Sequence, residues 1–211
     1  MTAVIFDCDG TLVDSEPLAR LAWERALAPY GYALTDADAE SCIGLPYPRV
    51  HEYFAARVTL PDAEAFWSEF SGELFTLIDT ELIPFDDAVG AARELRSRGV
   101  PVAVASSSPR ERLERTLGRA GLLDAFDVVV AGDEVEHGKP APDMFLLAAA
   151  RLGVRPATCV VIEDSPPGVQ AGRAAGMFTL AVCRVPGTEG SLAAADRVVD
   201  TVSADAILEA A

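Results

Sequence analysis

The sequence predicts an α/β protein with a parallel β-sheet, helices on both faces of that sheet, and an inserted helical segment. Three observations lead to this fold class. Short apolar runs typical of buried strands recur along the chain, segments of helical period separate most of them, and one long interval contains helical segments only. Strands that alternate with helices form a parallel sheet, because each crossover helix brings the chain back to the same edge.

The expected strands are short runs rich in Val, Ala, Ile and Phe and bounded by Gly, Pro, Asp or Ser. They cover Ala3–Phe6, Val100–Ala105, Phe126–Ala131, Cys159–Ile162 and Phe178–Cys183. Helical period predicts helices over Asp87–Arg98, Arg110–Ala120, Asp143–Leu152 and Gly168–Ala175. A glycine follows each helix, which favours a left-handed helix end at Gly99, Gly121, Gly153 and Gly176.

The interval from residue 15 to residue 84 breaks the alternation of strand and helix. It carries no strong strand signal, but helical stretches are predicted over Pro17–Tyr30, Pro48–Ala56 and Ala63–Ile78. This is too much chain for one crossover helix. The predicted domains are therefore a core of residues 1–14 and 85–211 and a helical cap of residues 15–84. We expect the cap over the carboxyl edge of the sheet, where open α/β sheets bind ligands.

The charge of the chain excludes some classes of partner. The 33 acidic residues outnumber the 17 Lys and Arg residues, which gives a formal net charge of −16. Such a charge opposes binding to nucleic acid or to an anionic membrane, so we expect neither, and a small-molecule substrate is favoured. If that substrate carries phosphate, local positive charge from a metal, a lysine or helix N-termini has to compensate for the acidity.

We expect neither a signal peptide nor a membrane span, and we expect the cysteines to be reduced. The N-terminus runs from Met1 into an apolar strand without a basic region, and no apolar stretch reaches the ~18 residues of a membrane span. We therefore expect a cytoplasmic protein, as a monomer or weak dimer. The four cysteines show no CxxC spacing, which favours reduced structural thiols.

Two acidic motifs directly follow predicted strands. Asp7 and Asp9 end the first strand, and Gly10 lets the backbone turn away from it. An Asx turn would explain Asp9 and Gly10, but it would leave Asp7 buried and unpaired. Glu163 and Asp164 follow the fourth strand, where an acid could alternatively cap a helix. Gathered at one sheet edge, these four acids would repel one another unless a cation shared them, and all-oxygen ligands suit Mg²⁺.

Two further motifs supply groups that can hold phosphate. Ser106, Ser107 and Ser108 follow the second strand and precede a helix, so they could cap that helix or bind phosphate at its N-terminus. Lys139 is the only lysine of the chain and lies between Gly138 and Pro140. A single lysine is usually a solvated surface charge, but here it could offset the acids and grip phosphate.

These four motifs occur in a fixed order, each after its expected strand or loop: Asp7–Thr11, Ser106, Gly138–Pro140 and Glu163–Asp164. With them the chain resembles the haloacid dehalogenase-like hydrolase superfamily over nearly its whole length. Within that superfamily it is similar to the β-phosphoglucomutase/phosphatase branch with an α-helical cap. The resemblance implies a Rossmann-like core and a cap inserted after the first motif.

The resemblance also implies roles for individual residues. Asp7 would attack phosphorus, and Asp9 would act as general acid and then as general base. The residues implied in phosphate binding are Thr11, Ser106, Ser107 and Lys139. Mg²⁺ is the implied cofactor, and the residues implied to bind it are Asp7, Asp9 through its backbone, Glu163 and Asp164.

The chemistry expected from this resemblance is hydrolysis of a small phosphorylated metabolite, such as a sugar phosphate, through an aspartyl-phosphate. The dehalogenases that name the superfamily lack an acid at the position of Asp9, which argues against dehalogenation. Phosphonate hydrolysis needs a lysine in the cap for a Schiff base, and residues 15–84 contain no lysine.

Two alternative functions, and the residues of the cap that contact substrate, stay open at this point. A phosphomutase similar to β-phosphoglucomutase shares all four motifs, but it carries a histidine and a lysine in the cap where this chain has Ala19 and Thr76. Candidate substrate contacts of the cap are Gly44 and Arg49, although Arg49 could equally be a solvated residue at a helix N-terminus. A catalytically silent phosphometabolite-binding protein is the alternative of another class.

Overall fold

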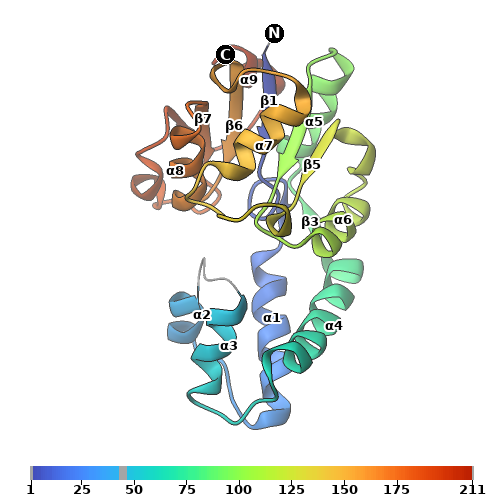
Figure 1. Ribbon diagram of the computed structural model, residues 1–211, viewed down its shortest axis with the longest axis vertical. Helices are drawn as coiled ribbons and strands as arrows, with labels where there is room; N and C mark the ends of the chain where they lie inside the picture. The colour runs from blue at the N-terminus through green and yellow to red at the C-terminus, as the bar shows by residue number, and fades with distance from the viewer. Residues whose placement is uncertain (1, 43–46, 211) are drawn as a thin grey trace. The chain divides into compact units, whose positions relative to one another are not determined.

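The computed structural model describes residues 2–42 and 47–210, which form two compact units. One unit comprises residues 1–14 and 83–211 and carries the main β-sheet, and the other comprises residues 15–82 and is helical (Figure 1). The chain therefore leaves the sheet-bearing unit after Asp14 and returns to it at Ile83.

The main sheet has six parallel strands in the order β5-β4-β1-β6-β7-β8. The strands are β1 (Ala3–Phe6), β4 (Val102–Ala105), β5 (Val128–Val130), β6 (Cys159–Glu163), β7 (Phe178–Val182) and β8 (Arg197–Val199). From β1 the chain fills one side of the sheet with β4 and β5, and it then crosses to the other side with β6. The carboxyl ends of β1 and β6 therefore form a topological switch point, the usual place for a ligand.

The α/β fold class and the five expected strands are confirmed, and one strand of the main sheet escaped prediction. That strand, β8, has three residues at the edge of the sheet, and Arg197 in it is exposed. A short edge strand with a charged residue lacks the apolar run by which buried strands are recognised.

Within residues 2–14 and 83–210, five helices and four short 3₁₀ turns accompany the strands. The helices are α5 (Asp86–Ser97), α6 (Arg110–Arg119), α7 (Asp143–Leu152), α8 (Pro166–Ala174) and α9 (Ala204–Leu208). The turns are η2 (Leu123–Ala125), η3 (Gly132–Glu134), η4 (Pro156–Thr158) and η5 (Glu189–Leu192). The four helices predicted in this part of the chain are confirmed, and the glycines that follow them have φ between 65° and 75°. Across residues 2–42 and 47–210, no helix combines the length and the apolar composition that a membrane crossing requires.

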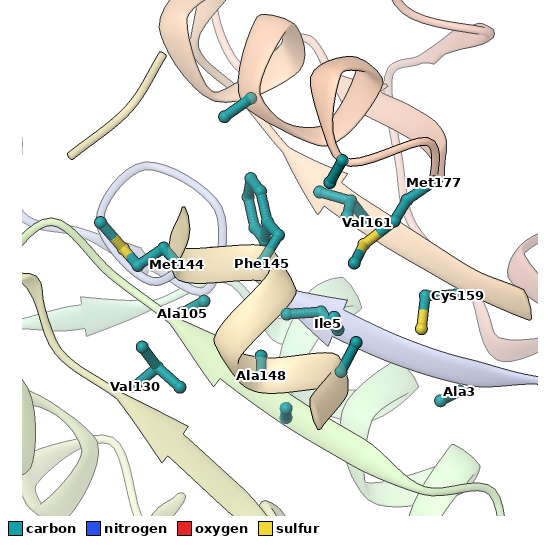
Figure 2. Close-up of a cluster of buried hydrophobic side chains, with 14 residues drawn as sticks. Ala3, Ile5, Ala105, Val130, Met144, Phe145, Ala148, Cys159, Val161 and Met177 are labelled. Carbon is teal, nitrogen blue, oxygen red and sulfur yellow. The ribbon is translucent and has the colours of Figure 1, made fainter. Parts of the chain in front are cut away.

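Both faces of the sheet are buried. On one face, Ile5 of β1 packs in a cluster with Phe145 of α7 and with Ala171 of α8 (Figure 2). Val4 and Phe6 point to the opposite face because side chains alternate along a strand, and they are also fully buried. A sheet covered on both sides fixes the strand ends, and with them the residues that follow each strand.

A small antiparallel ladder marks the two points where the chain passes between the units. It joins β2 (Val13–Asp14) to β3 (Ile83–Pro84), with Val13 paired to Pro84. The Phe85 amide also donates to the Leu12 carbonyl oxygen at 2.9 Å. Strands of two residues are too short to show a period, so the sequence did not predict this ladder.

The helical unit contains α1 (Glu16–Leu27), η1 (Ala28–Tyr30), α2 (Asp36–Cys42), α3 (Tyr47–Ala55) and α4 (Ala63–Glu81). Its core is aromatic. The Trp23 ring lies 4.2 Å from the Phe70 ring and 5.3 Å from the Phe54 ring, measured between centroids. The sequence predicted the helical character of this unit but missed α2, a seven-residue helix with acidic residues in its first turn.

Asp38 of α2 is a buried carboxylate inside the helical unit. It accepts hydrogen bonds from the hydroxyl groups of Thr35 at 2.6 Å, Tyr53 at 2.9 Å and Tyr32 at 3.0 Å. These bonds favour the charged form, and the hydrogen bond from Thr35 contributes most to lowering the pKa of Asp38 to about 2. The acid thus ties α2 to α3 and to the loop that precedes α2.

Candidate active site

The predicted acidic residues meet at the carboxyl ends of the two central strands. Phe6 of β1 and Ile162 of β6 are register partners, and the Asp7 amide donates to the Ile162 carbonyl oxygen at 2.9 Å. Asp7 and Glu163 therefore stand side by side at the switch point of the sheet. Both side chains are buried, with 8% and 1% of their surface exposed.

Lys139 places its ammonium group between these two acids. Its Nζ bonds Asp7 Oδ1, donates to Glu163 Oε1 at 2.7 Å and donates to the Ala105 carbonyl oxygen at 3.2 Å. The side chain is only 6% exposed. Burial alone would lower the pKa of Lys139, but the charges of Asp7 and Glu163 outweigh it and raise that pKa above its ordinary value. The lysine is therefore a buried cation held by two carboxylates.

The acids of this site carry more negative charge than Lys139 neutralises. Burial raises the pKa of Asp7 well above its ordinary value, and Glu163 and Asp164 raise it further although Lys139 opposes them. Burial and the charge of Glu163 also raise the pKa of Asp164 to about 7. Three carboxylates beside one ammonium group leave two formal negative charges in a buried place. Such a site favours a further cation.

Glu163 is held by hydrogen bonds through both of its carboxylate oxygens. Oε1 accepts from Lys139, and Oε2 accepts from the Asp164 amide at 2.9 Å, the Ser165 amide at 2.8 Å and the Ser165 hydroxyl at 2.9 Å. The backbone at Gly168 comes so close that an added Cβ would lie 1.7 Å from Oε1. Position 168 therefore requires glycine as long as Glu163 keeps these bonds.

The loop after β1 packs against Asp164. Gly10 has φ of 84°, and a Cβ at this position would lie 2.1 Å from Asp164 Oδ2. The Thr11 hydroxyl donates to Asp164 Oδ1 at 3.1 Å. Gly10 thus provides both the left-handed turn and the close approach of the backbone, which bring the Thr11 hydroxyl onto the acid of the neighbouring strand.

Asp9 faces a different set of groups, located at the start of α6. Its Oδ2 accepts from the hydroxyl groups of Ser108 at 2.7 Å and Ser106 at 3.3 Å. Its Oδ1 accepts from the guanidinium group of Arg112 at 2.9 Å. Ser106 and Ser108 are buried, whereas the Ser107 side chain is exposed.

The two candidates of the helical unit are less defined. Arg49 has a side chain that is 69% exposed and donates to Glu52 Oε2 at 2.8 Å, one turn further along α3. Gly44 lies outside the described residues. Arg49 is thus an accessible cation, and its role in binding substrate stays a prediction.

Comparison with known proteins decides the family. Residues 1–176 match the haloacid dehalogenase-like hydrolase family. The chain belongs to this family. The prediction that it is an enzyme of the haloacid dehalogenase-like hydrolases is therefore confirmed, and the acids at the ends of β1 and β6 occupy the carboxyl edge of its Rossmann-like core.

Individual relatives of this hydrolase include phosphatases. Fructose-1-phosphate phosphatase YqaB of Escherichia coli is 39% identical over 180 residues, which cover 82% of this chain and 92% of YqaB. The bifunctional riboflavin kinase/FMN phosphatase of Arabidopsis thaliana is 34% identical over 205 residues, 95% of this chain. The hydrolase spans about half of that longer relative, 53% of its length.

A solved structure shares the whole fold of this hydrolase. A Thermotoga maritima protein assigned as a beta-phosphoglucomutase superposes with a TM-score of 0.83 at 32% sequence identity. The match covers 99% of this chain and 97% of the Thermotoga chain. The predicted Rossmann-like fold with inserted helices is therefore confirmed.

The arrangement of the acids in the hydrolase differs from the cage of four carboxylates that the sequence suggested. Among the described residues, no group of three or more His, Cys, Asp or Glu side chains is arranged to hold a metal ion. The Asp9 carboxylate is directed to Arg112 and the serines, and both oxygens of Glu163 are engaged in hydrogen bonds. Asp7 and Asp164 are the two carboxylates whose oxygens suit a hard divalent cation, and burial, followed by the charge of Glu163, raises the pKa of both.

Sequence reasoning missed Arg112 of the hydrolase as a site residue, and it did not assign a contact with Asp9 to Ser108. Ser108 is one of three consecutive serines, and nothing in the sequence distinguishes the one that reaches Asp9 most closely. Arg112 is one of several arginines in α6. Its contact with Asp9 depends on the pairing of β1 with β4, which brings the loops after these two strands together.

Proposed function

We propose that this hydrolase is a Mg²⁺-dependent phosphatase that releases inorganic phosphate from a small phosphorylated metabolite, such as a sugar phosphate, through an aspartyl-phosphate on Asp7. One observation carries the proposal: Lys139 is buried between Asp7 and Glu163, with Asp164 beside them, at the switch point of the sheet. A carboxylate at a strand end, flanked by a buried cation, is suited to attack phosphorus.

In the first step of the proposed reaction, an Asp7 carboxylate oxygen forms a bond to phosphorus as the bond from phosphorus to the ester oxygen breaks. Asp9 gives its proton to the departing oxygen. Lys139 neutralises charge at the phosphoryl group. The Ser106 and Thr11 hydroxyl groups are suited to donate to its oxygens once they turn away from Asp9 and Asp164. The Ser107 side chain is exposed, so we assign phosphate contact at this position to its backbone amide, at the start of α6.

In the second step, water attacks the phosphorus of the aspartyl-phosphate. Asp9 accepts a proton from that water, inorganic phosphate leaves, and Asp7 regains its carboxylate. Proton transfer of this kind contributes about 10²- to 10⁴-fold to the rate, so D9N should slow turnover by that order. D7N should abolish turnover, because the nucleophile is then missing.

The residues proposed to hold Mg²⁺ are Asp7 and Asp164 through their side chains and Asp9 through its backbone carbonyl. When bound, the ion would neutralise charge on the phosphoryl oxygens and keep Asp7 ionised. Glu163, expected from the resemblance to bind the metal, is instead assigned an orienting role. Its four accepted hydrogen bonds hold Lys139 and the backbone of residues 164 and 165 in place.

The helical unit is proposed to act as a cap that selects the substrate, with Arg49 and Gly44 as contact residues. The name of the YqaB relative supports a sugar phosphate as the substrate class. A phosphomutase is the second candidate, and the similarity to the Thermotoga beta-phosphoglucomutase fold favours it. Against a mutase, position 19 is alanine and the Thr76 hydroxyl donates to the Gly72 carbonyl oxygen of its own helix at 2.9 Å.

The purified protein should hydrolyse p-nitrophenyl phosphate in the presence of Mg²⁺, and EDTA should remove that activity. A panel of phosphorylated metabolites, followed by release of inorganic phosphate, then identifies the substrate. D7N serves as the inactive control. Isomerisation of a sugar phosphate that depends on glucose 1,6-bisphosphate, without release of phosphate, would favour the mutase. No turnover of any compound, with intact binding of phosphate esters, would favour a silent binding protein.

A further inference from the structure

The Asp9 carboxylate is held from both of its oxygens. A carboxylate that transfers protons has to be directed at its target, and hydrogen bonds to a single oxygen would let it rotate. Ser108 and Ser106 hold Oδ2, at 2.7 and 3.3 Å, and the Arg112 guanidinium group holds Oδ1 at 2.9 Å. The serines come from the loop after β4, whereas Arg112 comes from the first turn of α6.

Arg112 is a partly buried residue with an unsatisfied donor. Its side chain is 19% exposed and that of Asp9 is 21% exposed, so solvent screens this ion pair less than it screens a surface pair. The Nε of Arg112 is buried and has no hydrogen-bond partner among the described residues. An unsatisfied buried donor is costly, and such a cost is typical of a functional position.

The neighbours of Arg112 on α6 account for the stability of that helix. Leu113, Thr116 and Leu117 are the residues of α6 that are buried in the core. Arg112 lies beside this apolar stripe and makes its polar contact with the loop after β1. Anchoring of the helix therefore does not explain why an arginine occupies this position.

We propose that Arg112 is a positioning residue that fixes the orientation of the Asp9 carboxylate for both proton transfers. This inference rests on the proposed phosphatase function, in which Asp9 is the group that moves the protons. Arg112 acts through Asp9 and does not touch the reacting phosphoryl group. It should therefore affect the rate of the chemical steps and leave substrate binding unchanged.

Replacing Arg112 by methionine tests this role, because methionine keeps the apolar stem and removes the guanidinium group. We expect kcat of R112M to fall by about 10- to 100-fold, since a misdirected catalytic group can cost about 10²-fold. KM should change by less than about threefold. R112K should recover part of the lost kcat, and R119M, at the exposed far end of the same helix, should match the wild type. A rise in KM of R112M with unchanged kcat would make Arg112 a substrate contact and overturn the proposal.

A double-mutant cycle shows whether Arg112 acts through Asp9. In the D9N background, R112M should cause no further loss of kcat, because the group that it positions is already gone. An equal loss from R112M in the wild-type and D9N backgrounds would overturn the proposal. Thermal unfolding of each variant shows whether a loss of kcat comes from misfolding. If R112M is misfolded, the kcat of R112K is compared with that of the wild type instead.

A crystal structure of R112M separates failure of this inference from failure of the proposed function. We expect the Asp9 carboxylate in that variant to leave the Ser108 hydroxyl or to occupy two rotamers. A single Asp9 rotamer with the Ser108 contact unchanged would overturn the inference whatever the activity. Absence of phosphatase turnover in the wild type would refute the proposed function, and the rotamer of Asp9 would still decide the role of Arg112.

Discussion

Replacing Lys139 by methionine removes the buried positive charge between Asp7 and Glu163. Methionine retains a similar length and volume, so the variant tests charge with little change in packing. In the wild type the ammonium group contacts both carboxylates, and the three side chains are at most 8% exposed. Without it, three neighbouring acids stay in the site and lose the ammonium group that offsets their charge.

The expected loss of stability is large because Asp7 and Glu163, the partners of Lys139, stay buried. Breaking a buried ion pair from one side costs about 3 to 5 kcal/mol of the free energy of unfolding. For a chain of this size such a loss lowers Tm by about 6 to 20 °C. The acids can relieve part of the cost by taking up protons, which makes the loss dependent on pH.

The sign of that dependence follows from the raised pKa of Asp7. A carboxyl group whose folded pKa lies above its unfolded value of about 3.9 destabilises the fold as pH rises past that value. Removing Lys139 raises the pKa of Asp7 further. The stability deficit of K139M relative to the wild type should therefore be large at pH 8 and should shrink towards pH 5.

Scanning calorimetry in the presence of EDTA measures this deficit across the pH range. R98M is a matched control, since Arg98 also contacts two carboxylates, of Glu94 and Asp205, but at the exposed surface. We expect little change in Tm for R98M. A K139M deficit as small as that of R98M, or of equal size at pH 5 and pH 8, would refute the account of a buried and overcharged site.

Three further predictions concern single side chains. G168A should lower the free energy of unfolding by about 2 kcal/mol or more, because its Cβ collides with the hydrogen-bonded Glu163 side chain. G90A in α5, where nothing lies within 4 Å of the added Cβ, should be neutral or stabilising, and equal effects of the two variants would contradict the collision. D38N should lower the free energy of unfolding by about 1 to 2 kcal/mol at pH 7, and because the Asp38 pKa is lowered to about 2, this loss should disappear as pH falls from about 4 to 2. Urea unfolding followed by the fluorescence of Trp23 and Trp67, in the same unit, measures the loss, and a loss constant with pH would exclude this explanation. R184M should lower the free energy of unfolding by about 2 kcal/mol, because Arg184 donates to the Asp87 carboxylate and to the Thr11 carbonyl oxygen, both at 2.9 Å. An unchanged calorimetric Tm would argue against a stabilising role of these two hydrogen bonds.

The sequence predicted the acidic edge of the sheet because strand ends are visible in the pattern. An apolar run followed by acids fixes where β1 and β6 end, and parallel strands in a sheet end on the same edge. Asp7, Glu163 and Asp164 could therefore be brought together without coordinates. The Mg²⁺ ion that the sequence suggested at this edge stays a prediction, which the raised pKa values of Asp7 and Asp164 favour.

Side-chain direction within that edge could not be predicted from the sequence. Asp7 and Asp9 are two residues apart and were expected to face one cation, but Gly10 turns the backbone so that the Asp9 carboxylate is directed to Arg112 and the serines. The four hydrogen bonds of Glu163 depend on the path of the chain after β6, which periodicity does not reveal. Sequence patterns fix elements and their ends, whereas loop geometry decides which oxygen accepts from which donor.

The central claim is that Asp7 becomes covalently phosphorylated during turnover. Rapid acid quenching of the enzyme during hydrolysis of its substrate, followed by digestion and mass spectrometry, tests this claim directly. We predict a phosphoryl group on Asp7 in the peptide that begins the chain, sensitive to hydroxylamine, present with Mg²⁺ and absent from D7N. Steady turnover by the wild type with no phosphorylated peptide at any quench time, or with the phosphoryl group on another residue, would contradict the account.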